Sequence, residues 1–409
     1  MKILLINNFH YLRGGSERAY FDLAKILESH GHEVAFFSMR DEKNQLSKWD
    51  KYFVDNVDYN AKDLSVWQKV RMAQRLIFNF QAKRNLEKLI LDFQPDVAHL
   101  HNIYHQLSLS VIYALKKHSI PMVLTLHDYK LISPNYNLFL RGKIWEKKSL
   151  WACIEDRCVK DSYLKSALGA FEKFLHYVLG TYAKINLFIS PSIFLTTKFK
   201  EFSFPGKIEH ISNPLLGTFC SIGTVDDTRG PLVYYGRLSK EKGIAIAIQA
   251  IKDLPEEKLQ IVGDGPEKDN LEKLVEELGL ENRVDFTGFK DGEELKEILN
   301  KAKAILIPSI WYENMPYAIA EALCLKKIVI ASDIGGIPDL ITDSENGLLF
   351  KPGMAESLAG KIKQLNAVVM EKIKINATKS AERFSSENYY SKIMAAYENI
   401  IAERKSSRT

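Results

Sequence analysis

Arg237 and Lys242 are the two basic residues whose setting in the sequence best suits a bound phosphate. They lie in the segment 236–243, which follows a short apolar run typical of a strand and leads into a helical segment. A guanidinium fork, an ammonium point charge and the positive end of a helix dipole together suit a diphosphate. Such charges more commonly belong to a solvated turn, and the spacing alone leaves both interpretations open.

A second candidate feature is the acidic pair Glu313 and Glu321, which are separated by seven residues. Pro316, which lies between them, suits the first position of a helix. We therefore expect Glu313 in a loop at the carboxyl edge of a sheet and Glu321 on the following helix. There the two carboxylates could bind two hydroxyl-rich groups, such as a hexose and a ribose. On spacing alone, a helix-capping acid and a surface acid are the simpler interpretation.

Several common phosphate-binding signatures are absent from the sequence. The Gly263-Asp264-Gly265 turn lacks the third glycine of a dinucleotide-binding fingerprint, and no Gly-x4-Gly-Lys-[Ser/Thr] sequence occurs. The sequence also lacks an Asp-x-Asp triplet, which argues against a diphosphate held through a metal ion. An anion site in this chain is therefore expected to be built in another way.

The framework for these residues is an alternation of strand-like and helix-like segments. One series of short apolar runs begins at residues 2–7 and continues at 33–38, 97–100, 121–126 and 187–190, and a second series begins near residue 231. This alternation predicts parallel sheets with helices on both faces. We expect an α/β fold of two Rossmann-like, doubly wound domains, residues 1–210 and 211–385. The ligand would lie at the carboxyl ends of the strands, in a cleft between the domains.

The composition is that of an ordinary globular protein and excludes several classes. Of the 409 residues, 46% are apolar and 26% are charged. No apolar run approaches the roughly 18 residues of a membrane-spanning helix, and the short apolar start does not suit a signal peptide. Four cysteines are too few for a disulfide framework, so we expect a cytoplasmic protein. Nucleic-acid binding is disfavoured because the net charge is only +5 and no recognised module is present.

Residues 66–90 combine aromatic and basic side chains in one expected helix. The first 210 residues carry a net charge of +9 and the remaining residues −4, so the basic segment lies in a basic half. A basic amphipathic helix with aromatic residues is typical of an element that lies on an anionic membrane, on the inner face of the cell membrane in this case. A helix that packs its apolar face on its own sheet explains the pattern equally well.

The histidines and cysteines are too few in any one place to predict a metal site. His99 and His101 would share one face of a strand and could form a metal pair, but spacing places no third ligand beside them. We expect hydrogen-bonded histidines at the edge of the cleft instead. Cys153 and Cys158 alone cannot complete a tetrahedral zinc site, and the sequence leaves the role of this pair open.

Taken together, the motifs resemble those of the family 4 glycosyltransferases, and the resemblance covers nearly the whole chain. Each motif is weak alone, but their order and spacing are specific. The motifs are Gly14-Gly15-Ser16-Glu17, Gly31-His32-Glu33-Val34, Thr125-Leu126-His127-Asp128-Tyr129, Gly236-Arg237 with Lys242-Gly243, Val262-Gly263-Asp264-Gly265-Pro266, Val284-Asp285-Phe286-Thr287-Gly288, the Glu313 and Glu321 pair, Ser332-Asp333-Ile334-Gly335-Gly336-Ile337-Pro338-Asp339 and Asn346-Gly347-Leu348-Leu349.

The resemblance implies the GT-B architecture, in which a C-terminal helix, here residues 386–409, joins the first domain. It implies that Arg237 and Lys242 bind the donor diphosphate, that Glu321 binds the ribose, and that Glu313 takes part in catalysis at the donor sugar.

Further donor contacts are implied at Asn314, Met315 and Pro316 for the sugar and at Gly14 and Gly15 for the phosphates. The resemblance places His127, a catalytic residue, against the sugar from the first domain. Residues near the nucleotide base would be Gly263, Asp264, Thr287 and Gly288. Asp339 stands where the family commonly has a glutamate, so the edge of the base site would carry a shorter acid.

The function that this resemblance implies is that of a retaining, metal-independent glycosyltransferase without a cofactor. Its substrates would be a nucleotide-diphosphate sugar and a glycan or lipid-linked acceptor, in the assembly of surface polysaccharide or glycoconjugate. Two alternatives remain: another GT-B enzyme, such as a disaccharide synthase or a nucleotide-sugar epimerase, and a sugar-binding relative without turnover. The sequence names neither the base, the sugar, the acceptor nor the linkage.

Overall fold

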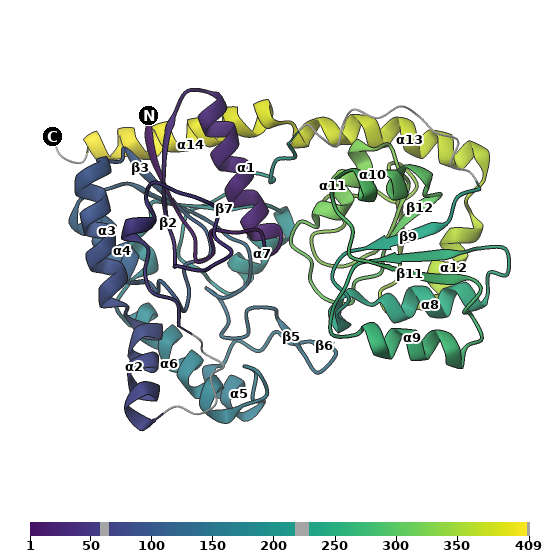
Figure 1. The fold of residues 1–409 in the computed structure, drawn as a ribbon, viewed down its shortest axis with the longest axis horizontal. Helices are drawn as coiled ribbons and strands as arrows, with labels where there is room; N and C mark the ends of the chain where they lie inside the picture. Colours follow the sequence, from purple (N-terminus) through teal and green to yellow (C-terminus); the bar gives the residue numbers. More distant parts are fainter. Residues whose placement is uncertain (58–64, 217–228, 407–409) are drawn as a thin grey trace.

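The computed structural model describes residues 1–57, 65–216 and 229–406, which form two α/β domains that lie side by side (Figure 1). Each domain contains a six-stranded sheet in which neighbouring strands are parallel. Most strands are short apolar runs that are buried almost throughout, as expected for sheets with helices on both faces, whereas the edge strands Ile208–His210 and Val284–Gly288 are partly exposed. The predicted α/β fold with two doubly wound domains is thus confirmed.

The first sheet has the strand order β2-β1-β3-β4-β7-β8. Its strands are β1 (Lys2–Ile6), β2 (Glu33–Phe37), β3 (Val97–Leu100), β4 (Met122–Thr125), β7 (Leu187–Ser190) and β8 (Ile208–His210). Strand β1 lies between β2 and β3, so the direction in which strands are added reverses between β1 and β3. In parallel sheets, ligand sites lie outside the carboxyl ends of the strands at such a switch point.

The second sheet repeats this plan with the order β11-β10-β9-β12-β13-β14. Its strands are β9 (Leu232–Tyr235), β10 (Leu259–Val262), β11 (Val284–Gly288), β12 (Ala304–Ile307), β13 (Val329–Ser332) and β14 (Leu348–Phe350). Here the switch point falls between β9 and β12. The loops that follow these two strands are the ones that carry Arg237, Lys242 and Glu313.

Helices cover both faces of each sheet, and a separate apolar core fills the space on each face. In the first domain these helices are α1 (Gly15–Ser29), α3 (Phe80–Phe93), α4 (Ser110–Lys117) and α7 (Ile193–Glu201). In the second they are α8 (Ile244–Lys252), α9 (Lys268–Glu277), α10 (Gly292–Lys301), α11 (Tyr317–Cys324), α12 (Ala355–Lys363) and α13 (Ala367–Ala381). Short 3-10 helices occupy Asp50–Tyr52, Tyr182–Lys184, Lys240–Lys242 and Glu382–Phe384.

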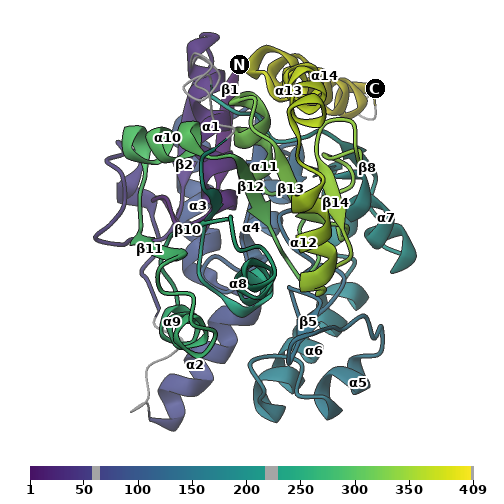
Figure 2. The same cartoon turned by 90° about the vertical axis from the view of Figure 1, so that its right-hand side faces the viewer.

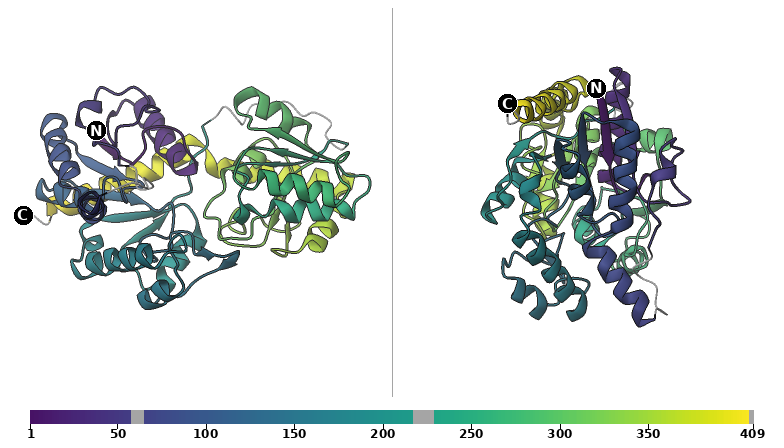
Figure 3. Two further views of the ribbon diagram at one scale, coloured as in Figure 1. Left: turned by 60° about the horizontal axis from the view of Figure 1, so that its bottom comes forward. Right: turned by 90° about the vertical axis from the view of Figure 1, so that its left-hand side faces the viewer.

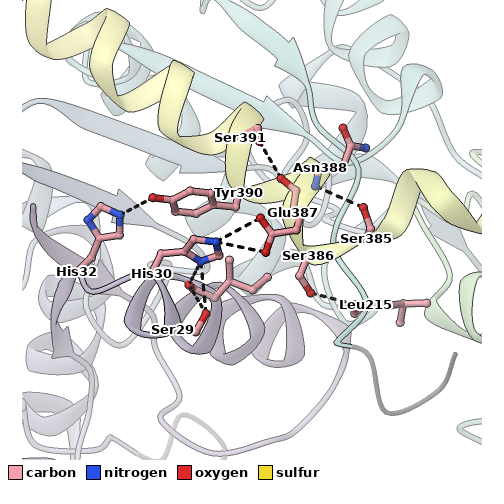
Figure 4. Close-up of polar contacts among 11 residues, drawn as sticks. Ser29, His30, His32, Leu215, Ser385, Ser386, Glu387, Asn388, Tyr390 and Ser391 are labelled. Atoms are coloured by element: carbon pink, nitrogen blue, oxygen red, sulfur yellow. Dashed lines mark hydrogen bonds and ion pairs between the residues drawn. The ribbon is translucent and has the colours of Figure 1, made fainter. Parts of the chain in front are cut away.

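The last helix, α14 (Ser386–Ser406), leaves the second domain and lies along the first, as Figures 1 and 3 both show. Its apolar side chains are buried in a core shared with β1 and α1; they include Tyr389, Ile393, Tyr397 and Ile400. At the end of α1, the ring of His30 stacks on Tyr390 with the centroids 3.6 Å apart, and His32 Nε2 lies 2.9 Å from the Tyr390 hydroxyl (Figure 4). The helix thus supplies part of the core of the first domain.

Residues 66–90 form two helices, and the expectation of one continuous helix is wrong. Helix α2 (Val66–Ile77) ends before Asn79, whose side chain caps α3 by accepting a hydrogen bond from the Ala82 amide. The Asn79 amide in turn donates to the Ser108 hydroxyl, which fixes the break against the neighbouring loop. The apolar face of α3 belongs to the domain core, including Leu86 and Leu89, so only α2 remains as a candidate surface element.

The first domain contains an inserted segment between β4 and β7. It contains the hairpin β5 (Phe139–Leu140) and β6 (Lys143–Ile144), followed by α5 (Leu150–Glu155) and α6 (Tyr163–Val178). The structure pairs Cys153 and Cys158 in a disulfide beside the buried Trp145, a bond that the sequence analysis does not anticipate. Among the helices that the structure describes, none combines the length and apolarity that a bilayer span requires.

Candidate functional site

Lys242 and Glu313 meet at the switch point of the second sheet. Lys242 ends the 3-10 helix after β9, and Glu313 lies in the loop after the neighbouring strand β12. The Lys242 ammonium donates a hydrogen bond of 2.7 Å to Glu313 Oε1, and the Ser309 hydroxyl donates to the same oxygen at 2.7 Å. The ammonium also lies over the Trp311 ring, 5.4 Å from its centroid. The two charges are therefore held in fixed positions.

The carboxylate of Glu313 is buried and ionised. Burial opposes its ionisation, but the Lys242 ammonium and the hydrogen bonds that it and Ser309 donate outweigh burial and hold the pKa of Glu313 below its usual value. Lys242 remains partly exposed and has two further N–H donors beyond the one that binds Glu313. It can therefore bind an anion while Glu313 keeps it in place.

The backbone at Glu313 and Asn314 is fixed by the loop that follows β13. The Gly336 amide donates a 2.7 Å hydrogen bond to the Glu313 carbonyl, and a Cβ on Gly336 would overlap the carbonyl oxygen of Asn314. Gly335 has φ +63°, and a Cβ there would lie only 2.7 Å from the backbone nitrogen and oxygen of Glu313. Only glycines permit this approach of the two loops.

Arg237 lies beside a second set of close turns at the ends of β9, β10 and β11. Gly263 has φ +143°, and a Cβ there would overlap the carbonyl oxygen of Gly236. The Gly263 amide donates to the Gly288 carbonyl at 2.8 Å, so the turns that carry Arg237 and Gly288 lie on either side of Gly263. Arg237 is exposed, and no described residue forms an ion pair with its guanidinium.

The other residues that the family resemblance assigns to the nucleotide base lie in the same turns. Asp264 is exposed, and its side chain accepts a hydrogen bond of 2.7 Å from the Gly265 amide. Thr287 is partly exposed at the end of β11. The structure therefore brings Gly263, Asp264, Thr287 and Gly288 together at the carboxyl ends of β10 and β11, which are two and three strands away from β12 and Glu313.

Glu321 lies on α11 and faces the first domain. It is buried, accepts a 2.9 Å hydrogen bond from the Tyr235 hydroxyl and forms an ion pair with Arg18 of α1. The interpretation of Glu321 as a surface acid is therefore wrong. Pro316 precedes the first turn of α11 rather than beginning it, with an extended ψ of 116°.

Arg18 is a functional candidate that the sequence analysis missed. Its guanidinium lies over the Tyr317 ring, 4.6 Å from the centroid, as well as against Glu321. Gly15 is packed on the same ring, because a Cβ on Gly15 would lie 3.3 Å from Tyr317 Cδ2. Gly14 is the N-cap residue of α1 and is exposed. The sequence could have indicated Arg18 as a candidate, because this residue directly follows the Gly14-Gly15-Ser16-Glu17 motif.

His127 lies where the two domains meet, at the carboxyl end of β4. Its carbonyl accepts a 2.6 Å hydrogen bond from Nδ2 of Asn314, so the first domain contacts the backbone segment beside Glu313. Its ring stacks on His101, with Nε2 of His127 2.9 Å from Nδ1 of His101. Burial lowers the pKa of His127 to about 4, so the ring is neutral at pH 7. Next to Asn314, Met315 is buried and its sulfur accepts from the Asn213 amide.

The expected histidine pair extends this stack into the domain. The rings of His99 and His101 are stacked with centroids 4.8 Å apart, on one side of β3. His99 lies 2.7 Å from the Thr125 hydroxyl and 2.6 Å from the Tyr397 hydroxyl of α14. Both side chains are fully buried rather than at the edge of a cleft. Within the described ranges, no group of three suitable side chains could hold a metal ion.

Two family models match the chain and together cover most of it. The model described as Glycosyltransferase Family 4 matches residues 13–215, and the model described as Glycosyl transferases group 1 matches residues 222–379. The first match spans the domain that carries Arg18 and His127, and the second spans the loops with Arg237, Lys242 and Glu313.

Curated relatives agree with these models. An uncharacterized glycosyltransferase of Methanocaldococcus jannaschii is 35% identical over 142 residues, which is 34% of this chain and 36% of the relative. A putative colanic acid biosynthesis glycosyltransferase of Salmonella typhimurium is 27% identical over 165 residues, 38% of this chain and 41% of the relative. The chain thus matches well under half the length of these relatives.

The fold has solved counterparts over its full length. A sucrose-phosphate synthase from Thermosynechococcus elongatus superimposes with a TM-score of 0.72 and 19% identity, over 98% of this chain and 99% of that one. At this identity the likeness shows the fold, which is the GT-B arrangement of two Rossmann-like domains.

Proposed function

The chain belongs to the family 4 glycosyltransferases, and on that basis we propose that it moves a sugar from a nucleotide-diphosphate donor to a glycan or lipid-linked acceptor, with retention of anomeric configuration. The observation that carries the proposal is the buried Glu313 carboxylate, held by Lys242 at the switch point of the second sheet and joined through Asn314 to His127 of the first domain. In the proposal, this fixed charge lies beside the bond between the donor sugar and its phosphates.

In this proposal the second domain stabilises the leaving diphosphate. As the bond between sugar and phosphate breaks, negative charge grows on the phosphate, and groups that bind this charge more strongly in the transition state raise the rate. Arg237, the two remaining donors of Lys242 and the N-terminus of α8, which begins at Ile244, would supply this binding. No metal ion is needed for the charge balance in this scheme.

The carboxylates would bind hydroxyl groups. Glu313 and the backbone of 314–316 would hold the donor sugar, and Glu321 would bind the ribose. The neutral ring of His127 would face the sugar from the first domain. In the present arrangement Arg18 contacts the carboxylate of Glu321, so a ribose that binds there must share Glu321 with the guanidinium or displace it. Nucleotide binding is therefore coupled to this contact between the domains.

The proposed setting is the assembly of surface polysaccharide. The role for which the Salmonella relative is named, colanic acid biosynthesis, supports this proposal, and the match covers 41% of that protein. The likeness to a sucrose-phosphate synthase keeps disaccharide synthesis as the alternative chemistry of the same site.

The proposal is tested by thermal unfolding in the presence of a panel of nucleotide sugars. A ligand present at 100 times its dissociation constant stabilises the folded state by about 2.7 kcal/mol, so at least one member should raise Tm clearly. The shift should disappear in Lys242→Ala and persist in Lys240→Ala, which removes an exposed charge from the same turn. If no member of the panel raises Tm, the assigned donor site is wrong.

Product analysis then separates the chemistry from its alternatives. Incubation with the stabilising donor and a polyisoprenyl-phosphate-linked or oligosaccharide acceptor should give one new glycosidic bond, and NMR of its anomeric proton should show the configuration of the donor. An inverted product would refute retention. Transfer only to a free or phosphorylated monosaccharide would favour a disaccharide synthase.

A further inference from the structure

Helix α6 has its two faces reversed relative to an ordinary surface helix. Its buried face is made of small and polar residues, namely Ser166, Gly169, Ala170, Glu172 and His176. Its exposed face is apolar and aromatic, namely Tyr163, Leu164, Phe171, Phe174, Tyr177 and Val178. The helix of a globular protein normally turns its apolar face to the core. Exposed apolar surface of this extent marks a site of interaction.

The buried polar face of α6 makes specific contacts with the rest of the first domain. Glu172 forms a 2.8 Å ion pair with Lys130, and both side chains are largely buried. The His176 ring lies 3.1 Å from the Thr181 hydroxyl, and Gly169 fits against Pro134. If the helix were rotated to bury its aromatic residues, it would leave Glu172 and Lys130 unpaired, which is costly for buried charges. The apolar face is therefore held outward.

The exposed face of α6 has a neighbour of the same character in α2. The backbone of Ile77, at the end of α2, lies against the buried ring of His176. Trp67 and Val70 of α2 are exposed, with 80% of the Trp67 surface accessible. Figures 1 and 2 show both helices at the same end of the first domain, below its sheet and away from α14. We call the exposed side chains of α6 and α2 the aromatic face.

Basic residues outnumber acidic ones in the segments that carry the aromatic face. Residues 141–184, which contain α6, include nine Lys or Arg and five Asp or Glu, and α2 contains Lys and Arg but no acidic residue. Exposed basic residues of these segments include Arg71 on α2 and Lys165 on α6. Tyr and Trp side chains favour the boundary between headgroups and acyl chains, and lysine and arginine favour anionic lipid. A second copy of this chain would bring like charges together around the same face.

We propose that the aromatic face of α6 and α2 docks on the surface of an anionic lipid bilayer. Helix α6 lies in the plane of the interface with Phe171, Phe174 and Tyr177 inserted among the headgroups, and the exposed basic side chains contact lipid phosphates. Lys130 and Pro134, which contact the other side of α6, belong to the segment that follows His127. The bilayer surface and the segment that begins at His127 are thus fixed to opposite faces of one helix. The docking does not depend on the proposed transferase activity.

The test uses the full chain and sucrose-loaded vesicles of phosphatidylcholine, with or without phosphatidylglycerol. The protein should co-sediment with the anionic vesicles at low salt and be released at high salt. The double variant Phe174→Ser/Tyr177→Ser should lower the bound fraction at least tenfold. The matched control Phe289→Ser/Val368→Ser removes two apolar side chains of the second domain that are at least as exposed, and this variant should bind as the parent does.

A measurement on the unmodified protein makes the test independent of how the variants fold. Trp67 and Trp151 are exposed on or beside the aromatic face, so anionic vesicles should shift the tryptophan emission to the blue, and brominated lipid should quench it. The proposal is overturned if neither change occurs, if the double variant binds as the parent does, or if sedimentation shows a dimer that the double variant abolishes. The nucleotide-sugar shift in Tm should survive the double variant, which separates this proposal from the donor site.

Discussion

Both domains contain a sheet of six parallel strands, but different kinds of contact hold the loops at the carboxyl ends of the strands in the two domains. In the second domain the loops are held by backbone contact at glycines such as Gly263 and Gly336, and they present ionised side chains. In the first domain the edge is held by side chains, including the stack of His99, His101 and His127, whose rings are neutral at pH 7.

This difference indicates that the two domains have different roles at the site. Fixed charges need a rigid backbone, because an electrostatic contact is most effective when no reorganisation is required during the reaction. A neutral imidazole edge suits a face that meets hydroxyl groups rather than phosphates. Electrostatic stabilisation is therefore expected from the second domain, and orientation of the sugar and acceptor from the first.

The largest effect is expected when the charges of the second domain are removed. Arg237→Ala or Lys242→Ala should lower kcat about 100- to 1,000-fold, or roughly 3–4 kcal/mol, since each removes a preorganised contact to the leaving phosphate. For Arg237, which is exposed, Tm should change little. Steady-state kinetics checks both variants, with Lys240→Ala as the control for net charge. Activity that chelator abolishes and magnesium restores would contradict a role for these side chains as the main phosphate ligands.

A second test compares how the two edges are held. Gly263→Ala should destabilise the protein by about 3 kcal/mol or more, because its φ is +143° and the added Cβ overlaps the Gly236 carbonyl. In the first domain, Gly14→Ala should change the free energy of unfolding by only about 0.5 kcal/mol, since Gly14 is extended with φ −171° and the nearest atom to its Cβ lies 3.8 Å away. Urea unfolding measures both. Equal losses would refute the contrast.

The last comparison uses pH to separate the stabilities of the two domains. All ten histidines lie in the first 210 residues, and burial lowers the pKa of His10, His105 and His127 to about 4 and that of His99 to about 3. A lowered pKa favours the folded state fully above the unfolded value of about 6.5, and this contribution is lost as pH falls toward 4. A histidine shifted to 4 contributes about 2 kcal/mol less at pH 5 than at pH 7.

Two buried carboxyl groups act in the opposite direction. Burial raises the pKa of Asp22 and Asp128 to about 6, so their protonation favours the folded state between pH 6 and 4 and partly offsets the histidines. The net effect is a loss of stability in the first domain on acidification from pH 7 to pH 5. Hydrogen exchange resolved by peptide should show faster exchange there first. Earlier loss of protection in the second domain would contradict this prediction.

Much of the second domain could be predicted from sequence because its functional residues follow strands directly. Lys242 and Glu313 are 71 positions apart, yet each comes just after an apolar run, and parallel strands bring such loops to one edge. The fold class follows from the same alternation. The close approach of Gly336 to Asn314 could not be read from the chain, because it depends on how two loops cross.

The first domain was harder to predict for physical reasons. Arg18 pairs with Glu321 across 303 positions, and no local pattern encodes that contact. Hydrophobic periodicity predicts the wrong buried face for α6, because it assumes that the apolar side of a helix is buried. The break within residues 66–90 was more accessible, since Asn79 is a residue type that favours a helix start.

The course of α14 has a consequence for how this protein is made. The helix is the last described segment of the chain, yet Ile393 and Tyr397 cover apolar side chains of β1 and α1 that are synthesised first. While the ribosome produces the second domain, Ile3, Leu5 and Tyr20 have no cover from this helix. The core of the first domain is therefore completed only after the second domain and α14 have been synthesised, and the nascent chain exposes these apolar side chains until then. The domain whose synthesis begins first thus completes its core after its neighbour has been made.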